Sequence, residues 1–352
     1  MSGVAETAFA AGRSIGRYFS VVAVLPALAL VSWVVILVSM GAWEGPVEPA
    51  NAARALTSLS LTTISALVLA ALVLGVIVNP FQFAATQVLE GYWPGGSVAS
   101  RLAASRINHY RRKLRSWELR TQAAEQEMIK GLVGEPGLED LERSLVLARE
   151  ELDGRAGDRY IRLDQVSRYG WHLARTFPPQ AGRILPTRLG NTLRASEDRV
   201  GRQYGLDAPT VAGHLSLLGQ NPRSQYVADT RTSMDLAIRV CLMGLLATPA
   251  TAALLANDGA WVLLVFVPYS VAYLGYRGAV SAASGYGNAV AYQVDLDRFS
   301  LYATLRVKRP NCVGQERQQN RELMPLLRGD PDAEISYAVD SDSSAEASHG
   351  EQ

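Results

Sequence analysis

Polar side chains able to bind an anion and move a proton are densest between residues 184 and 209, in the run ILPTRLGNTLRASEDRVGRQYGLDAP. Arginine forks match the geometry of phosphate, so one hypothesis for this run is contact with a phosphorylated substrate or a lipid headgroup. The candidates for that contact are Arg188, Asn191, Arg194, Arg199 and Arg202. A carboxylate beside a bound substrate can act as a general acid or base, and the candidates are Glu197 and Asp207.

The same run also fits a junction between two helices. Pro186 breaks any preceding helix, and from Thr187 a new helix can start with apolar side chains on one face. Those side chains are Leu189, Leu193, Val200 and Tyr204. Gly205 then supplies a C-terminal stop and Asp207 an N-cap for the next helix, with Pro209 in its first turn. We favour this junction over a catalytic site, and its arginine face is then solvated, internally paired or in contact with anionic headgroups.

Four long apolar stretches lie before and after this run in the sequence. A helix needs about 20 apolar residues to cross a membrane, and residues 18–43, 61–83, 236–256 and 260–276 are long enough. Arg239 lies near one end of the third stretch, where we expect its guanidinium to extend to the interface. Residues 257–259 predict a tight turn, so the third and fourth spans form a helical hairpin.

The distribution of basic residues orients these spans. Arg13 and Arg17 precede the first span, whereas the loop after it carries two glutamates and one arginine. The stretch after the second span has basic residues opposed only by Glu118, and they are Arg101, Arg106, Arg111, Arg112, Lys113, Arg115 and Arg120. Positive charge stays on the cytoplasmic side. Both termini and residues 84–235 are therefore expected to be cytoplasmic, with the spans in the inner (plasma) membrane.

Outside the spans the sequence predicts helices, so the expected fold class is all-α. Residues 98–130 read as a long charged helix, and leucines at helical spacing predict an antiparallel partner between 138 and 152. Residues 277–307 continue the fourth span as a helix. The expected organisation is a cytoplasmic N-terminus (1–17), two spans (18–83), an inserted helical cytoplasmic domain (84–235), a transmembrane hairpin (236–276), a helical extension (277–327) and a disordered acidic tail (328–352).

Several kinds of chemistry are not predicted. The formal net charge of +1 gives no electrostatic basis for binding nucleic acid. The four histidines are scattered, and the two cysteines, Cys241 and Cys312, lie far apart in sequence, so we expect no metal site. The sequence contains no phosphate-binding loop and no nucleophile motif, and we expect no cofactor.

Four short segments resemble signature segments of an uncharacterised actinobacterial family of multi-pass membrane proteins. They are LEGYWP (89–94), LPTRLGNTLRASE (185–197), YGLDAPTV (204–211) and VDLDRFSLYATL (294–305). The resemblance extends from about residue 60 to residue 330, and the PTRLGN-type segment is its most specific part. It implies the multi-pass architecture and carries no activity with it.

We interpret the chain as a non-enzymatic membrane scaffold or sensor. Anchored in the lipid bilayer, it would bind a cytoplasmic protein partner or a second copy of itself through its helical domain. The alternative is a membrane-bound enzyme acting on a lipid or phosphorylated substrate at the cytoplasmic face, with Arg188 and Arg194 holding phosphate. A transporter is disfavoured, because transporters usually place ionisable groups inside the bilayer and these spans have almost none.

Overall fold

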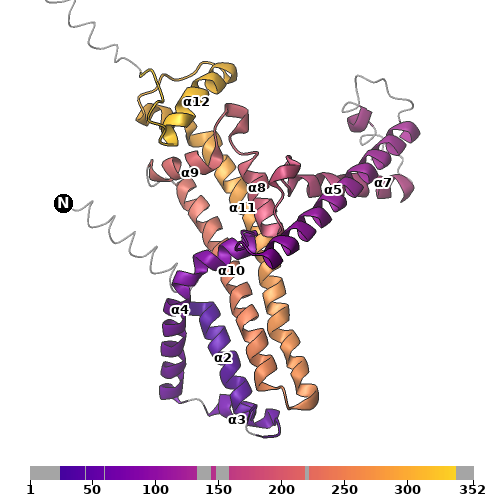
Figure 1. Ribbon diagram of the computed structural model, residues 1–352, viewed down its shortest axis with the longest axis vertical. Coiled ribbons are helices and arrows are strands. Elements are labelled where there is room, and N and C mark those ends of the chain that lie inside the picture. The colour runs from indigo at the N-terminus through magenta and orange to yellow at the C-terminus, as the bar shows by residue number, and fades with distance from the viewer. Residues whose placement is uncertain are drawn as a thin grey trace, which may run out of the picture. The chain divides into compact units, whose positions relative to one another are not determined.

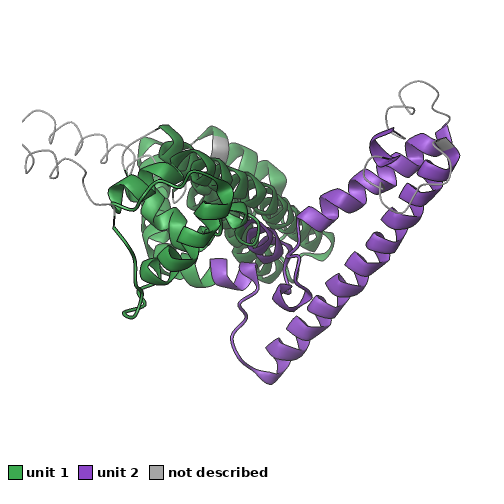
Figure 2. Ribbon diagram, turned by 90° about the horizontal axis from the view of Figure 1, so that it is seen from above, with its two compact units in different colours: residues 1–85, 197–352 green, residues 86–196 purple. Residues whose placement is uncertain are grey.

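The computed structural model describes residues 24–43, 45–58, 60–132, 144–147, 158–218 and 222–337. Across these residues the fold is all-α, with no strand and one isolated β-bridge, between Val307 and Tyr337. The chain forms two compact units, residues 1–85 with 197–352 and residues 86–196 (Figure 2). The segment predicted as one domain, 84–235, therefore contributes to both units.

Within the described part of the chain, three helical runs are long and apolar enough to cross a membrane. They are α4 (Leu61–Glu90), α10 (Pro222–Leu254) and the run Gly259–Thr304, which consists of the 3₁₀ turn η4 (Gly259–Val265) and α11 (Phe266–Thr304). Helix α2 (Leu25–Ser39) is apolar but shorter, and α3 (Pro49–Thr57) follows it. Residues 18–23 of the predicted first span lie outside the described residues.

Helix α4 exposes large apolar side chains along its apolar run. Leu69, Val76 and Phe81 are 63%, 57% and 65% exposed, whereas its buried residues are the small Ala71 and Gly75. Exposed apolar surface of this extent is unfavourable in water and is the expected surface of a helix surrounded by hydrocarbon. Small residues four positions apart let another helix approach closely.

Helices α10 and α11 pack side by side along their apolar halves (Figure 1). A Cβ added at Gly244 would lie 2.7 Å from the Ala272 nitrogen, and one at Gly275 would lie 2.7 Å from the Cys241 nitrogen. Real Cβ atoms do not approach backbone this closely, so both positions require glycine. The turn between the helices includes Gly259, whose φ is +56°.

Beyond its apolar half, α11 continues as one helix to Thr304, as predicted for residues 277–307. Val290, Val294 and Leu301 of this second half form a core with Val211 of α9 (Ala208–Leu217). Met324 of α12 (Val313–Leu327) belongs to the same core.

The acidic tail is predicted to begin at residue 328, but the described chain continues to pack within the first unit beyond that point. Ile335 packs against Tyr302 and Leu323, and Tyr337 pairs with Val307. Residues 338–352 lie outside the described residues.

The second unit is built on α5 (Ser97–Leu132), the long charged helix that the sequence predicts. It packs antiparallel against α7 (Asp158–Arg175): Tyr110 packs against Leu173, whereas Thr121, further along α5, faces Gly170. Of the partner helix predicted at 138–152, only residues 144–147 are described. The unit also contains η2 (Ala181–Arg183) and α8 (Arg188–Glu197), whose last residue belongs to the first unit.

Candidate functional site

The residues before α8 are docked on the end of α4 through close backbone contacts. The Thr187 hydroxyl accepts a hydrogen bond from the Gly190 amide at 3.2 Å and donates one to the Glu90 carbonyl at 2.7 Å. Gly190 is buried, and a Cβ there would overlap that carbonyl oxygen. Gly91, with φ of +103°, turns the chain against Pro186. The LEGYWP and LPTRLGN segments therefore form one structural junction, which we call the Glu90–Thr187 junction.

Asn191, a predicted candidate for contact with an anionic ligand, is fully buried. Its Oδ1 accepts a hydrogen bond from the Leu185 amide at 2.7 Å. Its Nδ2 donates to the carbonyls of Leu185 and Thr187 at 2.8 and 2.6 Å. The side-chain amide thus hydrogen-bonds to backbone groups of the bend that precedes α8. Both its oxygen and its nitrogen are bonded within the chain.

The predicted arginines have different surroundings. The half-buried Arg194 donates from Nη2 to the Tyr92 hydroxyl at 3.0 Å, and its guanidinium lies 5.6 Å from the Tyr92 ring centroid. Arg188 is exposed on the same helix. The other predicted members belong to the first unit and are Glu197, Arg199, Arg202 and Asp207. The predicted set is divided between the two units, and a shared anionic ligand stays a prediction.

The single helix predicted for 187–204 is wrong, because α8 ends at Glu197. Gly201 and Gly205, with φ of +75° and +77°, flank the 3₁₀ turn η3 (Arg202–Tyr204). Glycine adopts this left-handed conformation at little cost, which allows the helix to stop early.

Asp207 is the N-cap residue of α9, as predicted, but its carboxylate does not bond to the helix backbone. It instead accepts a hydrogen bond from the Thr210 hydroxyl at 2.7 Å and lies 3.3 Å from the Arg328 guanidinium. These contacts link the start of α9 to the residue that follows α12.

A buried polar cluster that the sequence did not single out joins α11 to α12. Glu316 Oε1 accepts hydrogen bonds from Arg298 Nε at 2.8 Å and from the Tyr302 hydroxyl at 3.0 Å. Asn320 Nδ2 donates to the Tyr302 hydroxyl at 2.7 Å and to the Tyr204 carbonyl at 2.8 Å. We call Arg298, Tyr302, Glu316 and Asn320 the Arg298 cluster. It brings the YGLDAPTV and VDLDRFSLYATL segments together.

The charges of the Arg298 cluster are matched internally. The Arg298 guanidinium, paired with Glu316, also lies 4.0 Å from the Tyr204 ring centroid. Tyr302 is about 38 Å beyond Arg277 along α11, well outside the predicted span 260–276. Burial, together with the negative charge of Glu316, raises the pKa of the Tyr302 phenol above its ordinary range. A buried network of this kind fixes the packing of a domain.

A second polar cluster lies among the apolar helices. Arg239 of α10 is 1% exposed and donates hydrogen bonds to Asn79 Oδ1 at 2.7 Å and to Gln82 Oε1, both in α4. Its burial corrects the expectation that the guanidinium reaches the interface. Asn79 and Gln82 lie three positions apart and so share a face of α4, beside Pro80. We call Arg239, Asn79 and Gln82 the Arg239 cluster. The sequence signal for it was the presence of two amides in an otherwise apolar span.

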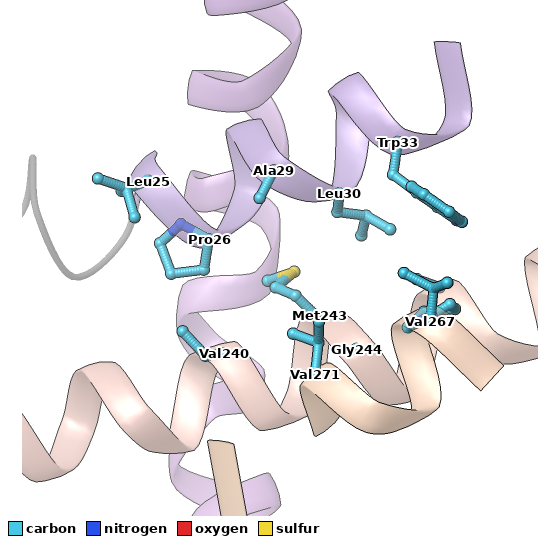
Figure 3. Close-up of a pocket in the computed structure, with 12 residues that line it drawn as sticks. Leu25, Pro26, Ala29, Leu30, Trp33, Val240, Met243, Gly244, Val267 and Val271 are labelled. Atoms are coloured by element: carbon cyan, nitrogen blue, oxygen red, sulfur yellow. The ribbon is translucent and has the colours of Figure 1, made fainter. Parts of the chain in front are cut away.

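An apolar cavity of about 250 Å³ lies between α2, α10 and α11 (Figure 3). Leu30 and Trp33 project from α2 toward the other two helices, where Met243 and Val267 are among the lining residues. The Trp33 indole Nε1 donates to Thr251 Oγ1 at 2.9 Å. The lining is apolar, so this space suits hydrocarbon and gives a polar substrate nothing to bind.

Comparisons with protein-family models, with curated proteins and with solved structures found no match to this chain. Among the described residues, no group of three histidine, cysteine, aspartate or glutamate side chains could hold a metal ion. The fold defines a class: an all-α chain whose three long apolar helical runs are compatible with an integral membrane protein.

Proposed function

We propose that the chain is a multi-pass protein of the inner membrane, with spans at 18–43, 61–83, 236–256 and 260–276. Both termini and residues 84–235 are then cytoplasmic. The exposed apolar surface of α4 supports the membrane location, and the basic residues of α5 support the orientation. The proposal includes membership of the actinobacterial membrane family, which rests on the resemblance of the four sequence segments.

The native cysteines allow a direct test of this topology. Cys312 is exposed between α11 and α12, whereas Cys241 is buried between α10 and α11. A membrane-impermeant maleimide is expected to label Cys312 in inverted membrane vesicles and to leave it unlabelled in intact spheroplasts. An Asn257→Cys variant, with Cys312 replaced by serine, is expected to give the opposite pattern. Labelling of Cys312 from outside would overturn the proposed orientation.

Within this topology, the chain acts as a scaffold or sensor that binds a protein partner through α7. At 100° per residue, Ile161, Gln165, Arg168 and His172 point away from the side of α7 that packs on α5. Tyr169 and Trp171 lie at the two edges of this surface, 45% and 53% exposed. We call these six residues the α7 outer face.

The observation that carries this proposal is that both exposed aromatic rings are held in place. The Trp171 indole donates to Glu125 Oε1 at 2.7 Å, and Glu125 is itself buried. The Tyr169 ring lies 4.6 Å from the Trp117 ring, centroid to centroid. Tryptophan, tyrosine and arginine dominate the binding energy of protein interfaces. Rings that are already ordered lose little conformational entropy on binding, which favours association.

The test is extraction of the tagged protein from its native membrane in detergent-free polymer discs, followed by mass spectrometry of co-purifying molecules. We expect a stoichiometric protein partner that is lost from an Ile161→Asp variant. Val313→Asp is the matched control, because Val313 is a similarly exposed apolar residue, in α12. Retention of the partner by Ile161→Asp, or its equal loss from Val313→Asp, would contradict binding at the α7 outer face.

The same experiment addresses the competing enzyme hypothesis. In that hypothesis Arg188 and Arg194 hold the phosphate of a lipid or phosphorylated substrate. An enriched phospholipid or polyprenyl phosphate, with no protein partner, would favour the enzyme. Loss of that lipid from Arg188→Gln in a folded protein would place the ligand on α8.

A further inference from the structure

We infer that the exposed basic face of α5 binds the surface of an anionic phospholipid bilayer. The first part of the helix, residues 97–120, carries seven basic residues and one acidic residue. The rest of the helix, residues 121–132, carries two acidic residues and one basic residue. Positive charge is therefore concentrated in the part of α5 that follows the membrane span most closely.

The basic residues include a row on the side of α5 opposite α7. At 100° per residue, Arg101, Arg112 and Arg115 point away from Tyr110 and Leu114, which pack toward α7. All three arginines are exposed, and none of them forms an ion pair within the described chain. Within the described residues, the one side-chain hydrogen bond of this row is donated by Arg112 Nε to the Asn108 carbonyl of its own helix, at 3.4 Å. These guanidinium groups are thus available to an outside anion.

Exposed apolar side chains lie beside the arginine row, at the start of the helix. Val98 and Leu102, one turn apart, are 68% and 56% exposed. A helix that combines arginines with exposed aliphatic residues is typical of those lying at a membrane surface, where the apolar groups enter the headgroup boundary. The combination distinguishes this face from an ordinary solvated one.

Chain connectivity brings this face within reach of headgroups. Only residues 91–96 separate α4 from α5, and six residues span about 20 Å at most. Tyr92 and Trp93 lie in this connection, and such rings favour the headgroup level. The inference rests on the proposed topology, in which the end of α4 emerges on the cytoplasmic side. Clusters of arginine immediately cytoplasmic of a span are typical of binding to anionic lipids.

The test uses the full-length protein with one fluorescent label on α5. Ser105 is exposed next to Arg101 and Arg112 on the helix surface, so Ser105→Cys with Cys312→Ser provides the labelling site, and the buried Cys241 is kept. The protein is placed in nanodiscs of phosphatidylcholine, with or without phosphatidylglycerol, that contain a lipid with a nitroxide headgroup. Quenching reports the ratio of docked to released α5. We expect strong quenching with phosphatidylglycerol at low salt, and its loss in phosphatidylcholine alone or in about 1 M salt.

Charge variants locate the effect. A triple variant, Arg101→Gln, Arg112→Gln and Arg115→Gln, is expected to lower the docked-to-released ratio about a hundredfold, or about fivefold per residue. The control is a second triple variant that changes the net charge equally, at three exposed arginines outside α5. Its substitutions are Arg162→Gln, Arg175→Gln and Arg321→Gln. It is expected to keep most of the quenching. Thermal unfolding of both variants checks that they are folded.

Three outcomes would overturn the inference. These are equal quenching in both lipid compositions, an unchanged ratio in the α5 variant, and an equal loss in the control. If the label instead responds to added single-stranded RNA or polyglutamate and not to phosphatidylglycerol, the face binds a soluble polyanion. Failure of the topology is recognised separately, because it appears in the labelling of Cys312.

Discussion

Arg239 of α10 donates a hydrogen bond to Asn79 of α4 across 2.7 Å, although the two residues are 160 positions apart in the sequence. Apolar helix surfaces can slide past one another in hydrocarbon at little cost, whereas a buried guanidinium must keep its acceptors. The contact therefore fixes the position of α4 relative to α10 along the helix axes.

Removing one acceptor of Arg239 is expected to destabilise the helices. Asn79→Leu leaves the buried guanidinium with fewer hydrogen bonds and is expected to cost about 1–3 kcal/mol. The thermal midpoint of the protein in nanodiscs measures this loss. Gln87→Leu likewise replaces a side-chain amide by an aliphatic group, at an exposed position of the same helix, and is expected to leave the midpoint unchanged. Equal midpoints for the two variants would contradict the role of Asn79.

The hairpin depends on glycine where its two backbones touch. In Gly244→Ala and Gly275→Ala the new Cβ meets backbone atoms of the facing helix, so the helices must separate. We expect each variant to lose about 1–3 kcal/mol of stability from overpacking. Gly285→Ala in α11 is the control: its Cβ meets nothing within 4 Å. That variant is expected to gain up to about 1 kcal/mol from helix propensity, measured in the same unfolding experiment.

The Glu90–Thr187 junction also depends on one glycine. In Gly190→Ala the added Cβ overlaps the Glu90 carbonyl, a backbone atom that no rotamer change can move. We expect a loss of about 3 kcal/mol and faster hydrogen exchange at both ends of the junction. Gly182→Ala, where a Cβ meets open space, should exchange like the wild type. Slow exchange in Gly190→Ala would show that the junction tolerates a side chain.

The Arg298 cluster is expected to lose stability in alkali. Its fold holds the Tyr302 phenol with a raised pKa, whereas the unfolded phenol ionises near pH 10. Above about pH 10 the unfolded state therefore releases a proton that the folded state keeps, and stability falls as pH rises. The loss from this group is about 1 kcal/mol at pH 11. Tyr302→Phe has no such proton, so its unfolding midpoint should fall less between pH 8 and pH 11 than that of the wild type.

The helices themselves were predictable because their signals are local. The apolar run of α4 and the charged periodicity of α5 can each be read within one stretch of chain. The continuation of α11 past Arg277 follows in the same way, from apolar residues that keep their helical spacing. None of these elements requires knowledge of its neighbours.

The polar contacts were not predictable because each depends on a distant partner. Arg239 lies near one end of an apolar stretch, which is typical of an interfacial residue, and only the structure shows that Asn79 faces it. On an isolated helix the side chain of Asn191 would be expected to be exposed. In the structure its amide forms hydrogen bonds with the backbone of residues 185–187. Glu316 and Asn320 lie four positions apart in a charged helix, which is equally typical of a solvated surface.

The unbroken length of α11 has a mechanical consequence. Its first turn, at Phe266, belongs to the apolar run, and Arg298 lies about 48 Å further along the same helix. A helix of this length behaves as a lever: a tilt of about 6° at the apolar end displaces the far end by about 5 Å, close to one helical turn. Because Glu316 bonds the far end of α11 to α12, a change in bilayer thickness that tilts α11 is expected to displace the packing of α11 against α12.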